Sequence, residues 1–254
     1  MAKVFVTGSS TGLGLIAARR LVAWGHDVTL HARDEGRAAE PRAALPGAPV
    51  VLGDLATVGG MRDVAAQATA LGRHDAVVHN AGVYRVPRRV ETADGLSLTF
   101  AVNVLAPYLL TALLPRPDRL VYLTSGMHDG GRAPLDDPQW TARRWDWMQA
   151  YSDSKLHVTT LAFAVARLWP DVASNAVDPG WVPTRMGGPG ATDDLDLGAD
   201  TQAWLAAGDD PAAAVTGRYL YHRRPRPAPP AASDVATQDA LLAYCAELTG
   251  ETLT

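Results

Sequence analysis

Cysteine is almost absent from this sequence of 254 residues, which contains only Cys245. A single cysteine cannot form an intrachain disulfide framework and cannot build a cysteine-based zinc site. The seven histidines are scattered along the chain without the H-x-x-x-H or H-x-H spacing of metal ligands. We therefore predict no metal site, and we interpret Cys245 as a small buried residue of a C-terminal helix in a protein of a reducing compartment.

Long apolar runs and an excess of positive charge are also missing. No stretch reaches the roughly 18 consecutive apolar residues of a membrane span, and the N-terminus does not show the basic and apolar pattern of a signal peptide. The formal net charge of -4 argues against a protein that binds nucleic acid through bulk positive charge. We therefore expect a cytoplasmic protein that binds neither membranes nor nucleic acid.

Short strands rich in valine and leucine alternate with helical segments along the chain. Continuous apolar strands between helices are typical of a parallel sheet that is covered on both faces. Right-handed crossovers then give an α/β, doubly wound Rossmann-type fold of three αβα layers, with its ligand at the carboxyl ends of the strands. We expect one domain over residues 1–254. The expected strands are 3–7, 27–32, 49–54, 75–82, 119–125 and 173–178, and the expected helices are 12–25, 58–72, 93–114, 151–169 and 233–250.

Three segments depart from this alternation: an insertion at 126–150, a substrate loop at 181–208, and a C-terminal arm at 222–254. The arm opens with the basic, proline-rich stretch 222–232, which we interpret as a solvated surface segment. Ser233 is the candidate N-cap of its helix, and Gly250 is the candidate stop. The insertion and the start of the substrate loop are apolar. Their large side chains would either line an apolar carbonyl pocket or pack as core, and both interpretations stay open; they are Trp140, Trp145, Trp147, Trp181 and Met186.

The stretch Gly8-Ser9-Ser10-Thr11-Gly12 fits G-x-S-x-G, the nucleophile elbow of an α/β-hydrolase. It also fits a loop that folds around a phosphate, because it follows an apolar strand and opens a helix. Glycines at the helix start allow close approach of the backbone, and the helix N-terminus favours an anion. The second interpretation is the better one, since the loop ends the first strand and Gly14 adds a third glycine.

Four motifs resemble those of the classical short-chain dehydrogenases/reductases. T-G-S-S-T-G-L-G at 7–14 is similar to their cofactor loop, and H-N-A-G at 79–82 is similar to their N-N-A-G turn, with His79 in place of the first Asn. Y-S-D-S-K at 151–155 matches their Y-x-x-S-K, and D-P-G-W-V-P-T at 178–184 resembles their P-G-x-x-x-T loop. The motifs occur in family order over residues 4–186. Residue patterns also resemble the branch of the retinol dehydrogenases and carbonyl reductases.

The resemblance implies a dinucleotide cofactor. Arg33 follows the second strand and Arg37 comes about one helical turn later, so two guanidinium groups could bind the 2′-phosphate of NADP. Asp34 between them is a signal for NAD, which we consider the less favoured cofactor. The cofactor-binding residues that the resemblance implies are Gly8, Ser10, Thr11, Gly12, Leu13, Gly14, Arg33, Arg37, Asp54, Leu55, Asn80, Ala81, Gly82, Tyr151, Lys155, Pro179, Gly180 and Thr184.

The resemblance also implies a catalytic group of Asn103, Ser125, Tyr151 and Lys155. Tyr151 and Lys155 are four residues apart in an expected helix and therefore share a face. A nearby ammonium favours the phenolate form of a tyrosine. Ser125 would bind the substrate oxygen, with Thr124 as the alternative, and Asn103 would relay protons through water to Lys155.

We therefore expect an NADP(H)-dependent oxidoreductase that interconverts a carbonyl and an alcohol by hydride transfer, with Tyr151 as acid and base. A non-catalytic NADP-sensing protein on the same fold is the alternative. The expected partner is a small carbonyl or alcohol substrate. The helix that carries Tyr151 is a common dimer surface in the family, and the insertion before it could block pairing. Both a monomer and a homo-oligomer therefore remain open.

Overall fold

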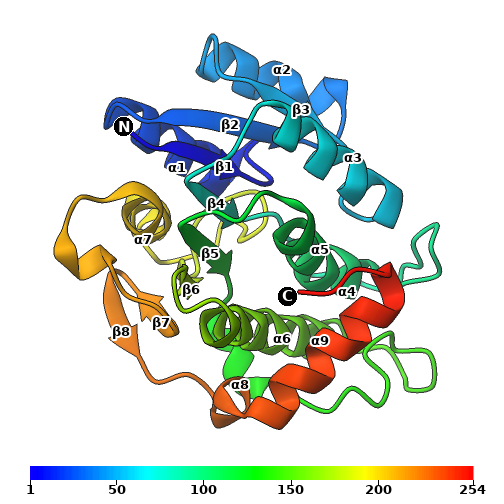
Figure 1. Ribbon diagram of the computed structural model, residues 1–254. Helices are drawn as coiled ribbons and strands as arrows, with labels where there is room; N and C mark the ends of the chain where they lie inside the picture. The colour runs from blue at the N-terminus through cyan, green and yellow to red at the C-terminus, as the bar shows by residue number, and fades with distance from the viewer. Residues whose placement is uncertain (254) are drawn as a thin grey trace.

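An eight-stranded sheet forms the centre of the protein (Figure 1). In the computed structural model, which describes residues 1–253, the strand order is β3-β2-β1-β4-β5-β6-β7-β8. The first seven strands are parallel, and only β8 is antiparallel to its neighbour. This is the expected doubly wound Rossmann-type arrangement. The strands are β1 Lys3–Val6, β2 Asp27–Ala32, β3 Val50–Leu52, β4 Ala76–His79, β5 Arg119–Leu123, β6 Ala173–Asp178, β7 Arg218–Tyr221 and β8 Arg224–Arg226.

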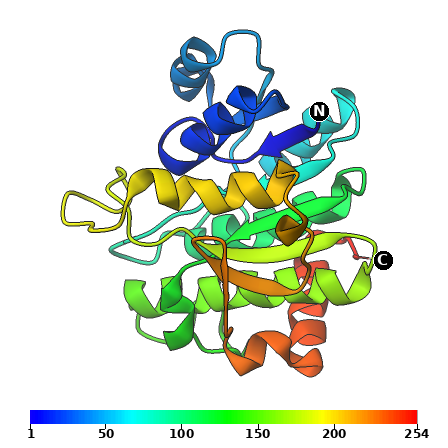
Figure 2. The ribbon, with the colours of Figure 1, turned by 90° about the vertical axis from the view of Figure 1, so that its left-hand side faces the viewer.

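Helices cover both faces of the sheet, and α1 lies beside α7 (Figure 2). The core on that face joins α1 and α7 to strand residues such as Val4 and Val6, whereas Phe5 points into the opposite core, with α3, α5 and α6. Successive strand side chains alternate between faces, so continuous apolar strands fill both layers. The helices are α1 Gly12–Ala23, α2 Glu35–Ala44, α3 Val58–Ala70, α4 Leu98–Phe100, α5 Ala106–Leu113, α6 Trp147–Leu168, α7 Leu195–Ala207, α8 Pro230–Ser233 and α9 Val235–Thr249.

The helix expected over 93–114 is shorter and is interrupted. A turn at Thr92 and Gly95 comes first, then α4, a π-helix over Ala101–Leu105, and α5. Pro107 has no N–H, so it cannot continue the regular hydrogen-bond ladder of the preceding turn. The wider π-turn lies directly before it, and Asn103 lies within that turn.

The C-terminal arm differs from its expected form. β8 lies near the start of the basic stretch 222–232 and pairs with β7. This part of the stretch is therefore an exposed edge strand of the sheet. Asp234, and not Ser233, is the N-cap of α9, because its carboxylate accepts a hydrogen bond from the Thr237 N–H. Gly250 ends the helix in the left-handed conformation, as expected. Thr254, the last residue of the expected arm, lies outside the described residues. The segment 181–208 is also not all loop, since it contains α7.

Candidate active site and cofactor site

The loop after β1 forms a cradle that only glycine can build. Gly8 and Gly12 have positive φ angles of 61° and 59°. A Cβ on Gly14 would lie 2.5 Å from the Asn80 side-chain nitrogen and 2.7 Å from the Gly8 carbonyl oxygen. Any side chain at Gly14 would therefore collide with the packed loop, and the backbone stays open for close approach by a ligand.

The N-terminus of α1 is left available to an anion. Thr11 is its N-cap residue but makes no side-chain capping hydrogen bond, and the first turn has no acidic residue. By contrast, carboxylates cap α2, α6, α7 and α9. Within residues 1–253, neither the Ser10 nor the Thr11 hydroxyl has a hydrogen-bond partner, whereas Ser9 is buried and donates to the Val6 carbonyl. The cradle, the free hydroxyls and the helix N-terminus fit the pyrophosphate of a dinucleotide.

The turn after β4 lies against this cradle. The Asn80 side-chain N–H donates to the carbonyl oxygens of Thr7 and Gly8, at 2.9 and 3.1 Å. A Cβ on Gly8 would lie 2.8 Å from the Cα atom of Ala81, and a Cβ on Gly82 would lie 3.7 Å from the Lys155 ammonium nitrogen. Asn80 thus holds the cofactor loop in place, and the Gly82 backbone lies beside the Lys155 ammonium group.

The loop after β6 closes over the other side of the cradle. The Thr184 methyl group lies 3.6 Å from the position that a Cβ on Gly12 would take, so the segment 178–184 reaches the cofactor loop. Gly180 has φ +82°, and its N–H donates to the Asp178 carboxylate at 2.9 Å. Thr184 Oγ1 accepts from the Gly187 N–H at 3.1 Å. Pro179 joins this turn to β6, and Leu13 on α1 accepts at its carbonyl oxygen from the Gln202 amide of α7.

Arg33 and Arg37 lie at the carboxyl end of β2, as the sequence places them. Both side chains are exposed, and the Asp34 carboxylate forms the N-cap of α2 by accepting from the Arg37 N–H at 2.9 Å. Arg33 Nε also lies 3.3 Å from Asp34 Oδ2. Asp34 therefore has a structural role at the helix N-terminus, and its presence does not by itself indicate a ribose contact.

The third strand brings Asp54 and Leu55 to the same edge. Asp54 is exposed and accepts from the Ala56 N–H at 3.0 Å. The Leu55 side chain is 4% exposed and packs in the core with Met61, which leaves its backbone as the part able to face a ligand. His31, which the motifs did not single out, joins this loop to the cradle through hydrogen bonds with Gly8 N and Gly53 O, both at 2.9 Å.

Ser125, Tyr151 and Lys155 meet where β5 ends against α6. Burial raises the pKa of the Tyr151 phenol above its ordinary value, and the nearby Ser125 side chain offsets part of this rise. The Lys155 ammonium nitrogen lies 5.5 Å from the centre of the Tyr151 ring and donates to the Leu123 carbonyl at 2.8 Å. Burial lowers the pKa of Lys155 to about 8. The free protein thus holds a neutral phenol beside an ammonium group at neutral pH.

Thr124 points away from this group, into the core. Its hydroxyl donates to the Lys155 carbonyl at 2.9 Å and accepts from the Thr159 hydroxyl at 2.8 Å. It is 2% exposed. Side chains alternate along β5, so Ser125 is the hydroxyl that faces Tyr151.

Asn103 lies in the π-turn beside the same group. Its Oδ1 accepts from the Val83 N–H at 2.8 Å, and its Nδ2 donates to the Ser154 hydroxyl at 3.0 Å. Ser154 in turn donates to the Tyr151 carbonyl at 2.7 Å. A Cβ on Gly82 would lie 3.3 Å from Asn103 Oδ1. Asn103 therefore connects the turn after β4 to the helix that carries Tyr151 and Lys155.

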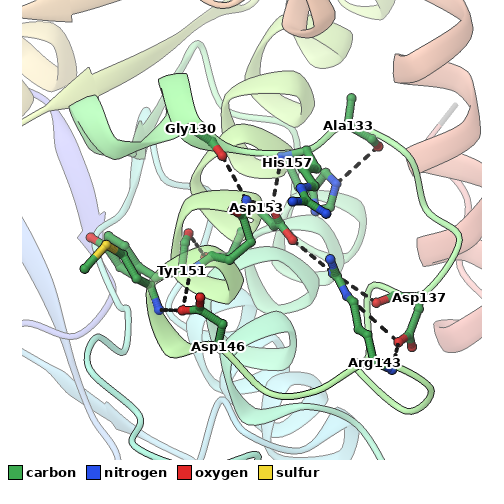
Figure 3. Close-up of polar contacts among 12 residues, drawn as sticks. Gly130, Ala133, Asp137, Arg143, Asp146, Tyr151, Asp153 and His157 are labelled. Carbon is green, nitrogen blue, oxygen red and sulfur yellow. Dashed lines mark hydrogen bonds and ion pairs between the residues drawn. The ribbon is translucent and has the colours of Figure 1, made fainter.

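The segment 126–150 is fastened to α6 by a buried polar network (Figure 3). The Asp153 carboxylate is its centre: it pairs with Arg143 at 2.9 Å and accepts from Gln149 Nε2 at 2.7 Å. The Arg143 guanidinium lies 3.6 Å from the ring centre of Trp140, which is 6% exposed. The sequence left open whether the large side chains of the insertion line a pocket or pack as core. Trp140 packs as core.

An aromatic cluster connects the insertion to Tyr151. The Tyr84 ring centre lies 4.5 Å from that of Tyr151 and 5.4 Å from that of Trp147, which meets it edge-on. Trp145 Nε1 donates to the Val86 carbonyl at 3.0 Å. Trp145 and Trp147 also line a cavity of about 440 Å³ together with Pro87, Arg144 and Asp146. The sequence left open whether Trp145 and Trp147 line a pocket, but no motif indicated that Pro87, from a segment distant in sequence, lies beside them.

Metal-ligand clusters and membrane-spanning helices are both missing from the described residues. No group of three or more His, Cys, Asp or Glu side chains among residues 1–253 is placed to hold a metal ion. Within the same residues, no helix has both the length and the apolar character needed to cross a bilayer.

Comparisons with known proteins agree with this geometry. Residues 2–125 match the family model described as short chain dehydrogenase. The chain is 39% identical to short-chain dehydrogenase chry4 of Gibberella zeae and 40% identical to short-chain dehydrogenase chyC of Penicillium rubens, each over 98% of both chains. Retinol dehydrogenase 13 of Homo sapiens is 33% identical over 72% of this chain and 60% of its own length. The similarity to a retinol dehydrogenase is thus lower and covers less of the chain.

Solved structures show the same fold. An uncharacterized protein from Mycobacterium Paratuberculosis superposes with a TM-score of 0.85 at 28% identity, over 100% of this chain and 95% of the other. A blue fluorescent protein from a metagenomic library, solved in complex with NADPH, gives a TM-score of 0.71 at 24% identity, over 87% and 95% of the two chains. At that identity the second likeness concerns the fold alone.

Proposed function

Since this chain belongs to the classical short-chain dehydrogenase/reductase family, we propose that it interconverts a carbonyl and an alcohol. The members of this family are oxidoreductases that act on alcohol and carbonyl groups with NAD(P). In the proposed reaction Tyr151 is the proton donor and acceptor, and NADP(H) is the preferred cofactor. The observation that carries this proposal is the meeting of Ser125, Tyr151 and Lys155 at the end of β5. The nicotinamide would supply or accept the hydride.

The proton chemistry follows from the environment of Tyr151. Burial raises the pKa of its phenol, so the hydroxyl is protonated at neutral pH and can donate to a carbonyl oxygen. Ser125 lies within hydrogen-bonding reach of that hydroxyl and can hold the same substrate oxygen. After donation, the nearby Lys155 ammonium stabilises the phenolate that remains. In the reverse direction, that phenolate accepts the proton of an alcohol.

The preference for NADP(H) rests on charge at the end of β2. Arg33 and Arg37 are both exposed there, and the carboxylate between them is used to cap α2. A phosphate near this end would meet two guanidinium groups, whereas a ribose hydroxyl would find its usual acidic partner already engaged. The cofactor loop and the α1 N-terminus would hold the pyrophosphate, and Lys155 would reach the nicotinamide ribose past Gly82.

A non-catalytic NADP sensor on the same fold is the second candidate function. It would need the cofactor loop but not the proton machinery. The hydrogen bonds that join Asn103 to Ser154 and Ser154 to the Tyr151 backbone favour the enzyme, because they orient a group that a sensor does not require.

The decisive experiment is a panel of carbonyls and alcohols with NADPH or NADP, together with the Tyr151→Phe variant. We expect wild-type turnover and a loss of about 10³-fold or more in Tyr151→Phe, since the proton donor and acceptor is removed. NADPH binding, followed by fluorescence, should remain. Full activity in Tyr151→Phe would refute the role of Tyr151. Tight NADPH binding without turnover of any panel member would favour the sensor.

A further inference from the structure

The cavity beside the aromatic cluster lies close to the catalytic tyrosine. Trp147, one of its walls, comes four residues before Tyr151 on α6, so the two side chains share a helix face about one turn apart. Tyr84 contacts both rings. A substrate whose carbonyl oxygen reached Tyr151 could therefore place its remaining part along Tyr84 and Trp147 into this cavity.

The walls of the cavity suit a flat ring. Trp145, Trp147 and Pro87 supply apolar surface, and the Trp145 N–H is engaged by the Val86 carbonyl, which fixes that ring in place. Aromatic walls of this kind favour offset-stacked or edge-on contact with a ligand ring. A volume of about 440 Å³ lies within the usual range for a small-molecule site.

The cavity is lined by one cation and one carboxylate, and only the carboxylate is engaged by the protein. Arg144 lines it, and the carboxylate of its neighbour Asp146 is used to cap α6, accepting from the N–H groups of Met148 and Gln149. Nearby Arg89 and Arg143 form ion pairs with Glu91 and Asp153. Across residues 1–253, no carboxylate lies at ion-pair distance from Arg144 or from Arg85.

Arg85 is a second exposed cation, and it lies on the Tyr84 ring of the aromatic cluster. Its guanidinium lies 5.0 Å from the centre of the Tyr84 ring, and its backbone has φ +51°, a left-handed conformation that costs energy in a residue other than glycine. One of its terminal nitrogens lies 3.7 Å from the position that a Cβ on Gly188 would take. Arg85 thus reaches from the Tyr84 loop to the loop after β6.

We infer that the natural substrate is an aromatic carbonyl compound that also carries an anionic group, with its ring in the cavity between Pro87 and Trp147 and its anion bound by Arg144 and Arg85. This inference rests on the proposed carbonyl–alcohol activity and assigns its substrate class. Arg144 at the cavity and Arg85 on the Tyr84 ring, which have no ion-pair partner among residues 1–253, select a carboxylate or an acidic phenol over a neutral analogue. Both arginines are exposed, so solvent screening keeps the selectivity moderate.

The test compares para-acetylbenzoate with its neutral methyl ester as substrates of the NADPH-loaded enzyme. We expect the wild type to reduce the acid with a KM about 5- to 10-fold lower than that of the ester. Arg144→Ala and Arg85→Ala should each raise the ratio of the KM of the acid to the KM of the ester by about 5-fold. Arg132→Ala is the matched control, because it removes an exposed arginine of the same insertion that does not line the cavity.

Equal KM values for acid and ester in the wild type would overturn the inference while leaving the carbonyl reductase activity intact. An equal effect of Arg132→Ala and Arg144→Ala would overturn it as well, because bulk charge would then explain the preference. If neither probe is reduced, calorimetry on the NADPH-loaded protein decides: tighter binding of the acid than of the ester, lost in Arg144→Ala, supports the anion site. Equal or absent binding of the two refutes it.

Discussion

The Gly8 backbone N–H donates a hydrogen bond to Nδ1 of His31 at 2.9 Å. Nδ1 must therefore be unprotonated, and Nε2, which lies 2.9 Å from the Gly53 carbonyl oxygen, carries the hydrogen and donates it. The neutral ring fixes the distance between the cofactor loop and the loop after β3. Burial lowers the pKa of His31 below its ordinary value of 6.5, outweighing the Asp54 carboxylate, which raises it.

We predict that His31→Leu weakens NADPH binding by about 10-fold, because the Gly8 N–H loses its acceptor and this part of the loop must be ordered by the ligand. His31→Gln should bind within about 3-fold of the wild type, since an amide supplies both an acceptor and a donor. Fluorescence titration with NADPH measures both values. Equal affinity of His31→Leu and the wild type would remove His31 from the cofactor site.

The same geometry predicts a pH dependence. Because the folded pKa is depressed, the stabilisation from His31 is fully present above pH 6.5 and is lost as the pH falls below it toward the lower folded value. NADPH affinity of the wild type should therefore decline only as the pH falls from 6.5 toward the lowered folded pKa, because protonated Nδ1 can no longer accept from Gly8. The His31→Gln variant should show a flatter profile over the same range. Parallel profiles for the two proteins would contradict this account.

The sequence predicted the parts of the site that local spacing determines. Tyr151 and Lys155 share a face because they are four apart on a helix, and the strand ends bring Gly8, Asn80 and Ser125 to one edge because the strands are parallel. The missed features depend on packing between distant segments. His31 looks like an ordinary strand residue until the Gly8 and Gly53 loops fold against it. The π-turn at Asn103 and the choice of Asp234 over Ser233 as N-cap likewise depend on tertiary context.

Charge substitutions at the end of β2 test the cofactor preference. We predict that Arg33→Ala together with Arg37→Ala lowers the preference for NADPH over NADH by about 10-fold or more, because both candidate phosphate ligands are lost. Arg42→Ala is the control: Arg42 belongs to the same helix but pairs with Glu35. Steady-state kinetics with both cofactors give the ratio. A wild-type preference for NADH would refute the assignment directly.

We predict that Lys155 lowers the stability of the free protein, although the proposed reaction needs it to stabilise the Tyr151 phenolate. Burial lowers the pKa of Lys155 from 10.5 to about 8. At neutral pH this shift means that the charged ammonium destabilises the folded protein by about 3 kcal/mol. Lys155→Met should therefore be inactive but about 1–2 kcal/mol more stable at pH 7, after allowing for the lost hydrogen bond to Leu123. Thermal unfolding should show a rise in Tm of several degrees.

The sign of this effect changes with pH. Between pH 8 and 10.5 the unfolded chain binds the lysine proton and the folded protein does not, so wild-type stability rises with pH in that window. The advantage of Lys155→Met should shrink from pH 8 upward and reverse by about pH 10, where the neutral amine still donates to Leu123. A pH-independent difference between the two proteins would mean that Lys155 is not desolvated in the folded state.

The last helix packs against α6, the helix that the family resemblance associates with pairing of two chains. α9 packs against α6 (Figure 1), with Arg167 Nε donating to Gln238 Oε1 at 2.8 Å and Leu241 buried at 1% exposure. We therefore predict a monomer by size exclusion with light scattering. Leu241→Ala should destabilise the protein by about 2–4 kcal/mol in urea unfolding, because it leaves a cavity in the main core. Val235→Ala, at a position 48% exposed on the same helix, should change stability by less than about 0.5 kcal/mol. A stable wild-type dimer whose contacts run along α6 would show that α9 does not replace a second chain.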